Sequence, residues 1–114
     1  MNKTRETLES ARRIIDNSEN WCQGTLEDRK GRVCSVGAID KATILQGNYG
    51  ARMDAVKALS EVVPAVIWEE RPDWMTDPEI ANKPQNRVAA YNDTHDHECV
   101  LAAFDSAIER LKDD

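Results

Sequence analysis

Apolar residues recur at helical spacing in three separate segments of the chain, with charged and polar residues between them. The three stripes are Leu8, Ala11, Ile14 and Ile15 within residues 2–17; Ala55, Val56, Leu59, Val62 and Val63 after residue 51; and Val100, Phe104, Ala107, Ile108 and Leu111 near the carboxyl end. Such spacing places the side chains on one face of a helix, which needs another element to bury it. We therefore predict one shared core that contains Ile15, Ile39, Leu59, Val62, Phe104 and Ile108.

The helical pattern is interrupted between Trp21 and Ser35. The stretches "WCQGTL" and "RVCSV" flank the polar sequence "EDRKG", which closes on Gly31. This arrangement predicts a short β-hairpin or an ordered loop with two arms. Ser35 is expected to cap a following helix that reaches Leu45 and is stopped by Gly47.

The four prolines all lie between residues 64 and 84, together with Trp68 and Trp74. Because proline removes a backbone donor and interrupts helices, residues 64–87 are predicted to be irregular apart from a turn begun by Asp77 and Pro78. The last helix is expected to begin after "YNDT". The predicted fold is mainly α: a single domain over residues 1–114, with about four helices and one short hairpin or ordered loop.

The charge balance narrows the range of partners. The chain has 114 residues, of which 32% are charged, and a net charge of −6. Proteins that bind nucleic acid normally present a basic surface to the phosphate backbone. Nucleic acid is therefore not expected to be a direct partner.

Cysteine usage and hydropathy favour a cytoplasmic protein. The three cysteines form no Cys-x-x-Cys pair, so neither a disulfide framework nor a zinc ribbon is indicated. The amino-terminal residues lack the apolar stretch of a signal peptide, and no segment approaches the roughly 20 apolar residues of a membrane span. We expect reduced thiols, no membrane association and no bound cofactor.

Several of the unusual residues fall in a pattern that other sequences share. The pattern comprises Trp-x-x-Gly, then Cys-x-x-Gly-Ala after a variable loop, then an aromatic residue followed by Asn-Asp, and finally a Phe in a helix. In this chain the positions are Trp21, Gly24, Cys34, Gly37, Ala38, Tyr91, Asn92, Asp93 and Phe104. The chain thereby resembles an uncharacterised family, a domain of unknown function from bacteria and their tailed phages, in which Trp is common at the position of Tyr91. The resemblance implies a small helical domain in a phage or bacterial cytoplasm and brings no known activity.

The stretch from Trp21 to Ser35 is a candidate site for an anionic ligand. A hairpin would bring Trp21 and Arg32 near the start of the helix after Ser35, where free N–H groups attract anions. A guanidinium and an indole beside that helix start would suit a nucleotide-like molecule. The candidate ligand-binding residues are Trp21, Gln23, Arg32, Ser35, Gly37, Tyr91, Asn92 and Asp93. The structural alternative is that Trp21 covers the core, Ser35 is an ordinary cap and Arg32 is a solvated loop charge.

The sequence "DTHDHEC" places three candidate metal ligands two residues apart: His95, His97 and Cys99. A zinc site would need a further ligand, which Cys22 or Cys34 would have to supply, and the spacing matches no standard motif. The alternative is that Asp93 or Thr94 caps a helix. We therefore expect no metal site.

Nucleophilic catalysis would require folding to place a histidine beside Cys22 or Cys34. Free cysteines are more often small buried hydrophobic residues. Because the chain carries no recognised catalytic motif, we expect that the protein is not an enzyme.

The proline-rich segment also contains a candidate interface. Tryptophan and arginine are enriched at binding hot spots, which makes Trp68, Arg71 and Trp74 candidate interface residues of a homodimer. The alternative is that both tryptophans fold back over the helices and belong to the core.

Two functions follow as hypotheses. The first is a non-catalytic accessory protein of phage or bacterial origin that binds a small anionic molecule, such as a nucleotide signal of host defence. The second is an acidic inhibitor or adaptor that occupies a basic site on a host protein.

Overall fold

The computed structural model describes residues 2–111, which form a mainly helical globule. Its α-helices are α1 (Lys3–Ile14), α2 (Ser35–Gln46), α3 (Arg52–Ser60), α4 (Pro84–Thr94) and α5 (His97–Arg110). Three short 3₁₀ helices accompany them: η1 (Ser18–Asn20), η2 (Tyr49–Ala51) and η3 (Trp68–Glu70). The predicted fold class is confirmed, and residue 1 and residues 112–114 of the predicted domain lie outside the described part of the chain.

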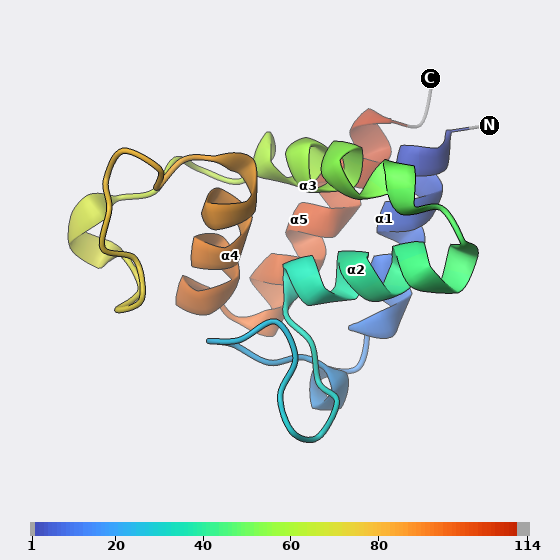
Figure 1. Cartoon of the computed structure of the whole chain (residues 1–114), viewed down its shortest axis with the longest axis horizontal. Coiled ribbons are helices and arrows are strands. Elements are labelled where there is room, and N and C mark those ends of the chain that lie inside the picture. The colour runs from blue at the N-terminus through green and yellow to red at the C-terminus, as the bar shows by residue number, and fades with distance from the viewer. Residues whose placement is uncertain (1, 112–114) are drawn as a thin grey trace.

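The helices pack around one another without a sheet in the described residues. α1 packs against α2, α3 and α5, and α4 packs against α2, α3 and α5. In Figure 1 the loop before α2 hangs below the helices, and the segment between α3 and α4 extends to the left of α4. None of the described helices is long and apolar enough to cross a membrane.

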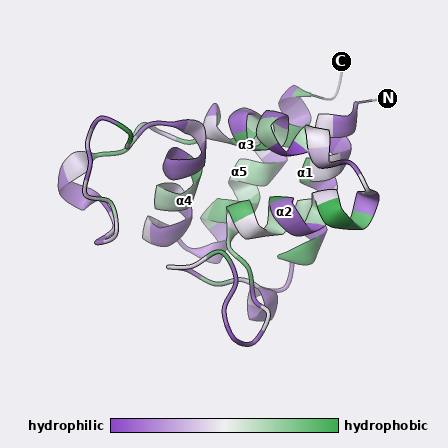
Figure 2. Cartoon of the chain, viewed as in Figure 1, coloured by the Kyte–Doolittle hydropathy of each residue, from purple (hydrophilic) through white to green (hydrophobic). Residues whose placement is uncertain are grey.

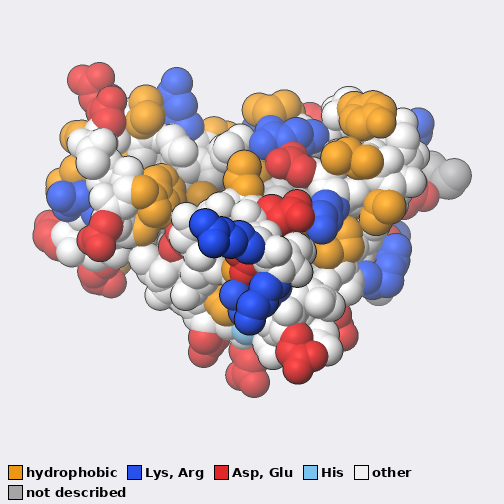
Figure 3. Space-filling view, turned by 60° about the horizontal axis from the view of Figure 1, so that its bottom comes forward, with side chains coloured by type: hydrophobic (Ala, Val, Ile, Leu, Met, Phe, Trp, Pro, Cys, Tyr) orange, Lys and Arg blue, Asp and Glu red, His pale blue; other side chains and the backbone are white. Residues whose placement is uncertain are grey.

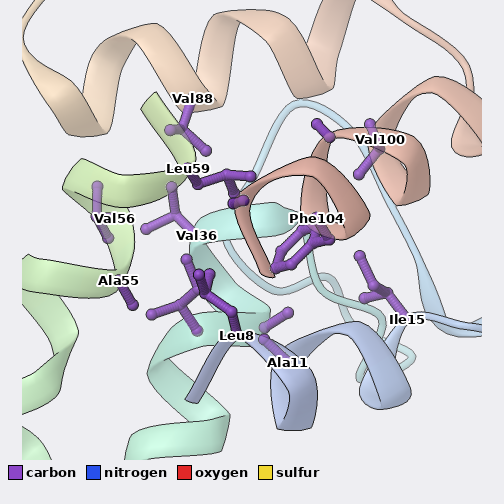
Figure 4. Packing of buried hydrophobic residues seen from close by; sticks show 14 of the residues in the cluster. Leu8, Ala11, Ile15, Val36, Ala55, Val56, Leu59, Val88, Val100 and Phe104 are labelled. Carbon is purple, nitrogen blue, oxygen red and sulfur yellow. The ribbon is translucent and has the colours of Figure 1, made fainter. Parts of the chain in front are cut away.

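The core lies where the apolar faces of the helices meet. Phe104 of α5 is fully buried, and Figure 4 shows it among apolar side chains from the other helices. The predicted core residues Ile15, Ile39, Leu59 and Phe104 are buried, and Val62 and Ile108 are partly buried against them. The predicted core is therefore confirmed. Figure 2 shows the same division, with most hydrophilic positions on the outer faces of the helices.

Side chains cap the first two long helices at their amino ends. The side chain of Asn2 accepts a hydrogen bond from the backbone N–H of Arg5 at 3.1 Å, and α1 begins there. At α2 the cap is Cys34, whose thiol accepts from the N–H of Gly37 at 3.5 Å. The prediction that Ser35 is the cap was wrong, because the backbone is extended at Cys34 and becomes helical at Ser35.

The carboxyl-terminal helix begins later than the sequence pattern indicates. Asp96 is its cap and accepts from the N–H of Cys99 at 2.9 Å. This bond lowers the pKa of Asp96 below its usual value. The prediction that Asp93 or Thr94 caps this helix was wrong, because both residues belong to α4.

α4 is an additional helix within and after the segment predicted to be irregular. It begins at Pro84, and the "YNDT" residues form its last turn rather than a linker. Proline suits the first position of a helix because its missing N–H would have no partner there. The irregular segment therefore ends at residue 83, and the turn predicted at Asp77 and Pro78 is present.

The segment from residue 64 to residue 83 is held on α4 by a small second core. That core contains Met75, Ala81 and Ala90, with Val66 and Trp68 packed against them. Arg71 lies over the ring of Trp68, 4.0 Å from its centroid. The segment is thus an ordered part of the globule despite its irregular backbone.

Residues 20–34 form an ordered loop with two arms rather than a β-hairpin. Only isolated bridges join its arms in the described structure, from Trp21 to Val33 and from Glu27 to Val33. Backbone hydrogen bonds from Cys22 to Val33 and from Asp28 to Arg32 hold the arms together. The chain reverses at the loop tip with Gly31 at a φ of 81°, a conformation that glycine adopts without strain.

Candidate functional site

Asn92 of α4 is a fully buried polar side chain at the base of this loop. Its Oδ1 accepts from Trp21 Nε1 at 2.7 Å, from the backbone N–H of Ser35 at 3.0 Å and from Ser35 Oγ at 2.8 Å. Its Nδ2 donates to the backbone carbonyl of Cys22 at 3.1 Å and to Asp93 Oδ1 at 3.0 Å. All the hydrogen-bonding groups of the amide are therefore used within the protein.

Two neighbouring side chains extend this network. Gln23 Nε2 donates to the carbonyls of Asn92 and His95, at 3.0 and 2.9 Å. Asp93 accepts from the N–H of Gly24 at 2.9 Å and from Trp74 Nε1 at 2.7 Å. We call this set the Asn92 cluster; it consists of Trp21, Gln23, Gly24, Ser35, Asn92 and Asp93.

The start of α2, predicted to attract an anion, already has internal partners. The N–H of Ser35 is bonded to Asn92, and the N–H of Gly37 is bonded to the thiol of Cys34. A Cβ on Gly37 would lie 2.2 Å from the carbonyl oxygen of Leu26, so glycine lets the loop backbone lie directly on the helix. The members of the Asn92 cluster thus meet, and they bind one another.

Arg32 belongs to the loop tip rather than to the helix start. Its Nε lies 2.5 Å from Asp28 Oδ2, and Asp28 Oδ1 accepts from the backbone N–H groups of Arg32 and Lys30. Burial alone would raise the pKa of Asp28, but the hydrogen bonds from Arg32 and Lys30 outweigh it and lower that pKa. The guanidinium therefore stabilises the turn that contains it.

Tyr91 faces a different part of the surface from the Asn92 cluster. Its ring stacks on His95 with a centroid separation of 3.8 Å, and burial raises the pKa of its hydroxyl. Both residues line a pocket of about 110 Å³ between residues 64–72 and α4. Because Arg71 and Arg87 also line it, we call it the arginine pocket.

Both arginines of this pocket are held by backbone carbonyls. Arg71 donates from Nε to Met75 at 3.0 Å and from Nη1 to Trp68 at 2.9 Å. Arg87 donates from Nε to Val63 at 3.1 Å and also from Nη2 to the same oxygen. No ion pair joins either guanidinium to a carboxylate in the described structure.

The cysteines are poorly suited to nucleophilic chemistry. Burial raises the pKa of the thiols of Cys22 and Cys34. A hydrogen bond with Asp96, followed by burial, raises the pKa of Cys99. The reactive form of a cysteine is the thiolate, so raised pKa values keep these thiols protonated at neutral pH.

Both histidines contact backbone carbonyl groups within the protein. His97 Nε2 lies 2.6 Å from the carbonyl oxygen of Ile15, and His95 Nδ1 lies 3.1 Å from the carbonyl oxygen of Tyr91. Residues 2–111 contain no group of three His, Cys, Asp or Glu side chains placed to hold a metal ion.

The candidate interface residues lie in two environments. Trp68 is partly buried beneath Arg71, whereas Trp74 remains 43% exposed although its indole binds Asp93. A second pocket, of about 180 Å³, lies beside Trp74 and Leu26. The hypothesis that the tryptophans fold back over the helices fits Trp68 better, and the hypothesis that they are exposed for an interface fits Trp74 better.

Two features were missed in the sequence. Arg87 was not a candidate, and only its place four residues before Tyr91, about one helical turn, could have linked the two side chains. Four exposed apolar residues around the end of α2 were also missed: Ile44, Leu45, Tyr49 and Met53. The adjacent pair Ile44 and Leu45 could have indicated an exposed apolar surface. Four consecutive helical residues cannot all face the core, and Ala42 and Thr43 already do.

Comparisons with known proteins give one positive result. No curated protein and no solved structure matches the chain significantly. A family model described as a family of unknown function, DUF6197, matches residues 1–110. That match extends from the amino end through the last turn of α5 and includes both the Asn92 cluster and the arginine pocket. The chain therefore belongs to DUF6197, a family of unknown function.

Proposed function

We propose that the protein is a non-catalytic binding protein that holds a small anionic ligand in the arginine pocket. The observation that carries the proposal is that two guanidiniums line one pocket and neither is paired with a carboxylate among residues 2–111. This is unusual in a chain with a net charge of −6, in which acidic side chains outnumber basic ones.

The guanidiniums are ordered before any ligand arrives. Arg71 uses Nε and Nη1 for carbonyl bonds, and Arg87 uses Nε and Nη2. A guanidinium has five N–H donors, so each arginine keeps donors for a phosphate or carboxylate. Because their side chains are already fixed, binding costs less conformational entropy than it would with free arginines.

The end of α4 is adapted to a nearby negative charge. Carbonyl groups at a helix carboxyl end repel anions. Here the hydroxyl of Thr94 donates to the carbonyl of Ala90 at 2.8 Å, and His95 Nδ1 lies 3.1 Å from that of Tyr91. These contacts give the carbonyl oxygens of Ala90 and Tyr91 partners within the protein.

The pocket limits the size of the bound group. A volume of about 110 Å³ is well below the roughly 300–1,000 Å³ of pockets that hold drug-sized ligands, so it suits a phosphate or carboxylate group rather than a whole nucleotide. The remainder of a larger ligand would lie outside, against Pro72 and the exposed side chain of Ile67.

The setting remains part of the proposal. The family resemblance implies a phage or bacterial cytoplasm, where sequestering a nucleotide signal would counter host defence. In that case the phosphate occupies the pocket and the base lies outside it. Cyclic and linear nucleotides therefore belong in the ligand panel.

Calorimetric titration with inorganic phosphate, acetate, pyrophosphate, AMP and cyclic nucleotides tests the proposal. Arg71→Gln should weaken binding by about 10- to 100-fold, the loss of a charge-assisted bond. Arg29→Gln removes the same charge from the exposed loop tip and is the matched control. Glu70→Gln should tighten binding, because it removes a negative charge from the pocket wall. Absence of binding to the whole panel, or equal weakening by Arg29→Gln, would overturn the proposal.

A second function, an acidic inhibitor or adaptor of a host protein, is favoured by the exposed side chains of Trp74 and Leu26. They are 43% and 46% exposed and flank the same 180 Å³ pocket. Native mass spectrometry of protein purified gently from cells separates the two functions. A retained small mass supports ligand capture, whereas a retained polypeptide supports inhibition.

A further inference from the structure

The strongest concentration of exposed apolar side chains lies at the end of α2, in the connection to α3 and at the start of α3. Ile44, Leu45, Tyr49 and Met53 are 61%, 74%, 68% and 60% exposed. They are half of the eight large apolar residues exposed in the described structure, and they lie within ten consecutive positions. Single exposed apolar residues are ordinary, but a concentrated group marks an interaction surface. We call these four residues the apolar corner.

Figures 2 and 3 show the same concentration. In Figure 2 the last turn of α2, at the right of the view, is strongly hydrophobic. In Figure 3 several orange side chains lie at the right end of the molecule, where α2 and α3 meet in Figure 1, and others lie over the left part of this face. The corner is separate from the proline-rich segment, which lies at the opposite end of the molecule in Figure 1.

The backbone of the corner is rigidly held. α2 ends at Gln46 and is capped by Gly47, whose φ of 64° reverses the chain and whose N–H donates to the carbonyl of Ile44 at 3.2 Å. The N–H of Asn48 bonds to the carbonyl of Thr43 at 3.0 Å, and Ala51 is buried beneath the turn. An ion pair of Arg52 with Asp40 then joins the start of α3 to α2. The exposed side chains therefore project from a fixed surface, which lowers the entropy cost of docking.

The charges around the corner indicate what binds to it. Residues 40–54 contain two acidic residues, Asp40 and Asp54, and two basic residues, Lys41 and Arg52, so this stretch is neutral in a chain of net charge −6. Two copies of an acidic protein repel each other over most of their surfaces, and a neutral apolar region is where they can meet. A membrane surface would instead need an excess of basic residues around the apolar group.

We propose that the apolar corner binds the apolar corner of a second copy of the chain. A two-fold axis through it makes the interface isologous, so each of the four side chains is buried on both copies. Tyr49, with its large ring and polar end, is the kind of side chain that anchors such a contact. This inference is independent of the arginine pocket and places self-association away from Trp68 and Trp74.

Sedimentation velocity of the full chain over a micromolar concentration series tests the inference. The wild type should be a dimer, and Leu45→Glu should raise the dimer dissociation constant at least about 10-fold, because like charges then face each other across the axis. The helical circular dichroism and the melting temperature of the Leu45→Glu monomer should match those of wild-type monomer.

Two further variants make the outcome decisive. Ile80→Glu places the same charge on an exposed apolar residue of the proline-rich segment and should leave the dimer intact. Trp74→Ala tests the surface predicted from the sequence and should also leave it intact. A wild type that stays monomeric throughout the series, or a dimer broken by Trp74→Ala but not by Leu45→Glu, would overturn the inference.

Discussion

The Asn92 cluster and the arginine pocket lie along the same helix, α4, yet they use their polar groups in opposite ways. In the cluster, the side-chain amide of Asn92 has partners for all its donors and acceptors inside the protein. In the pocket, Arg71 and Arg87 are held by carbonyls and retain donors that no carboxylate of the described residues occupies.

This difference separates residues that form the fold from residues available to a ligand. The positions chosen from the sequence as candidate ligand-binding residues include Trp21 and Asn92. In the structure these two residues hold a loop against α4 by hydrogen bonds. A buried polar network of this kind stabilises one arrangement of the chain only if every member is satisfied. Binding capacity is instead expected where charged groups are ordered but incompletely paired, as they are at Arg71 and Arg87.

The largest expected effect comes from removing the centre of the cluster. Asn92→Ala leaves the indole of Trp21, the N–H of Ser35 and the carbonyl of Cys22 without their partner in a buried site. We expect the free energy of unfolding to fall by on the order of 3 kcal/mol, measured by urea denaturation. Asn86→Ala, on the same helix, loses only a bond to the carbonyl of Ile80 and should cost less than about 1 kcal/mol. Equal losses in the two variants would remove Asn92 from its central role.

A somewhat smaller effect is expected at the contact between the loop and α2. In Gly37→Ala the new Cβ would meet the Leu26 carbonyl oxygen at 2.2 Å, so the loop must move away from the helix. Overpacking of this kind costs about 1–3 kcal/mol. Gly50→Ala is the matched control, since no atom lies within 4 Å of its Cβ position. If thermal melts show the two variants to be equally stable, the close approach does not hold the loop.

Asp93 joins the loop of the Asn92 cluster to the proline-rich segment, and its loss should weaken both contacts moderately. Its carboxylate binds the N–H of Gly24 in the loop and the indole of Trp74 in the proline-rich segment. Asp93→Ala should cost about 1–2 kcal/mol and shift the indole N–H resonance of Trp74 in ¹⁵N-correlated spectra. Asp73→Ala removes a charge next to Trp74 in the sequence without removing this bond. A Trp74 resonance that moves equally in both variants would indicate a charge effect only.

The sequence predicted the helices with strong apolar stripes and missed the helix without one. α1, α3 and α5 carry Leu8, Leu59 and Phe104 in regular stripes, and their burial followed from spacing alone. The buried residues of α4 are Val88, Ala90 and Asn92, so its apolar pattern was too weak to outweigh the nearby prolines. Pro84 at its first position was itself a signal for a helix start.

The candidate site was harder to predict because its partners are distant in the sequence. Asn92 is 57 residues from Ser35 and 71 from Trp21, so nothing local indicates that an asparagine there is buried. The ion pair of Arg32 with Asp28 could have been predicted from the sequence, because the two residues are four positions apart and of opposite charge. The cap at Cys34 rather than Ser35 reflects the tertiary contact, because Asn92 holds both polar groups of Ser35.

The smallest expected effect is a pH dependence at the loop tip, which contains Asp28. Hydrogen bonds from Arg32 and Lys30 lower the pKa of Asp28 in the folded protein, against the opposing effect of burial. A carboxylate with a lowered folded pKa stabilises the structure above its unfolded pKa of about 3.9, and that contribution is lost as the pH falls through the folded pKa. Acid should therefore loosen the turn before it unfolds the helices, which can be followed through the amide resonances of Lys30 and Arg32 from about pH 6 to about pH 2. Asp28→Asn removes the titrating group and should abolish this transition while the core signals of Phe104 stay unchanged. If the two amides titrate with a midpoint at or above the ordinary aspartate value, or if the transition persists in Asp28→Asn, the turn is not held by this carboxylate.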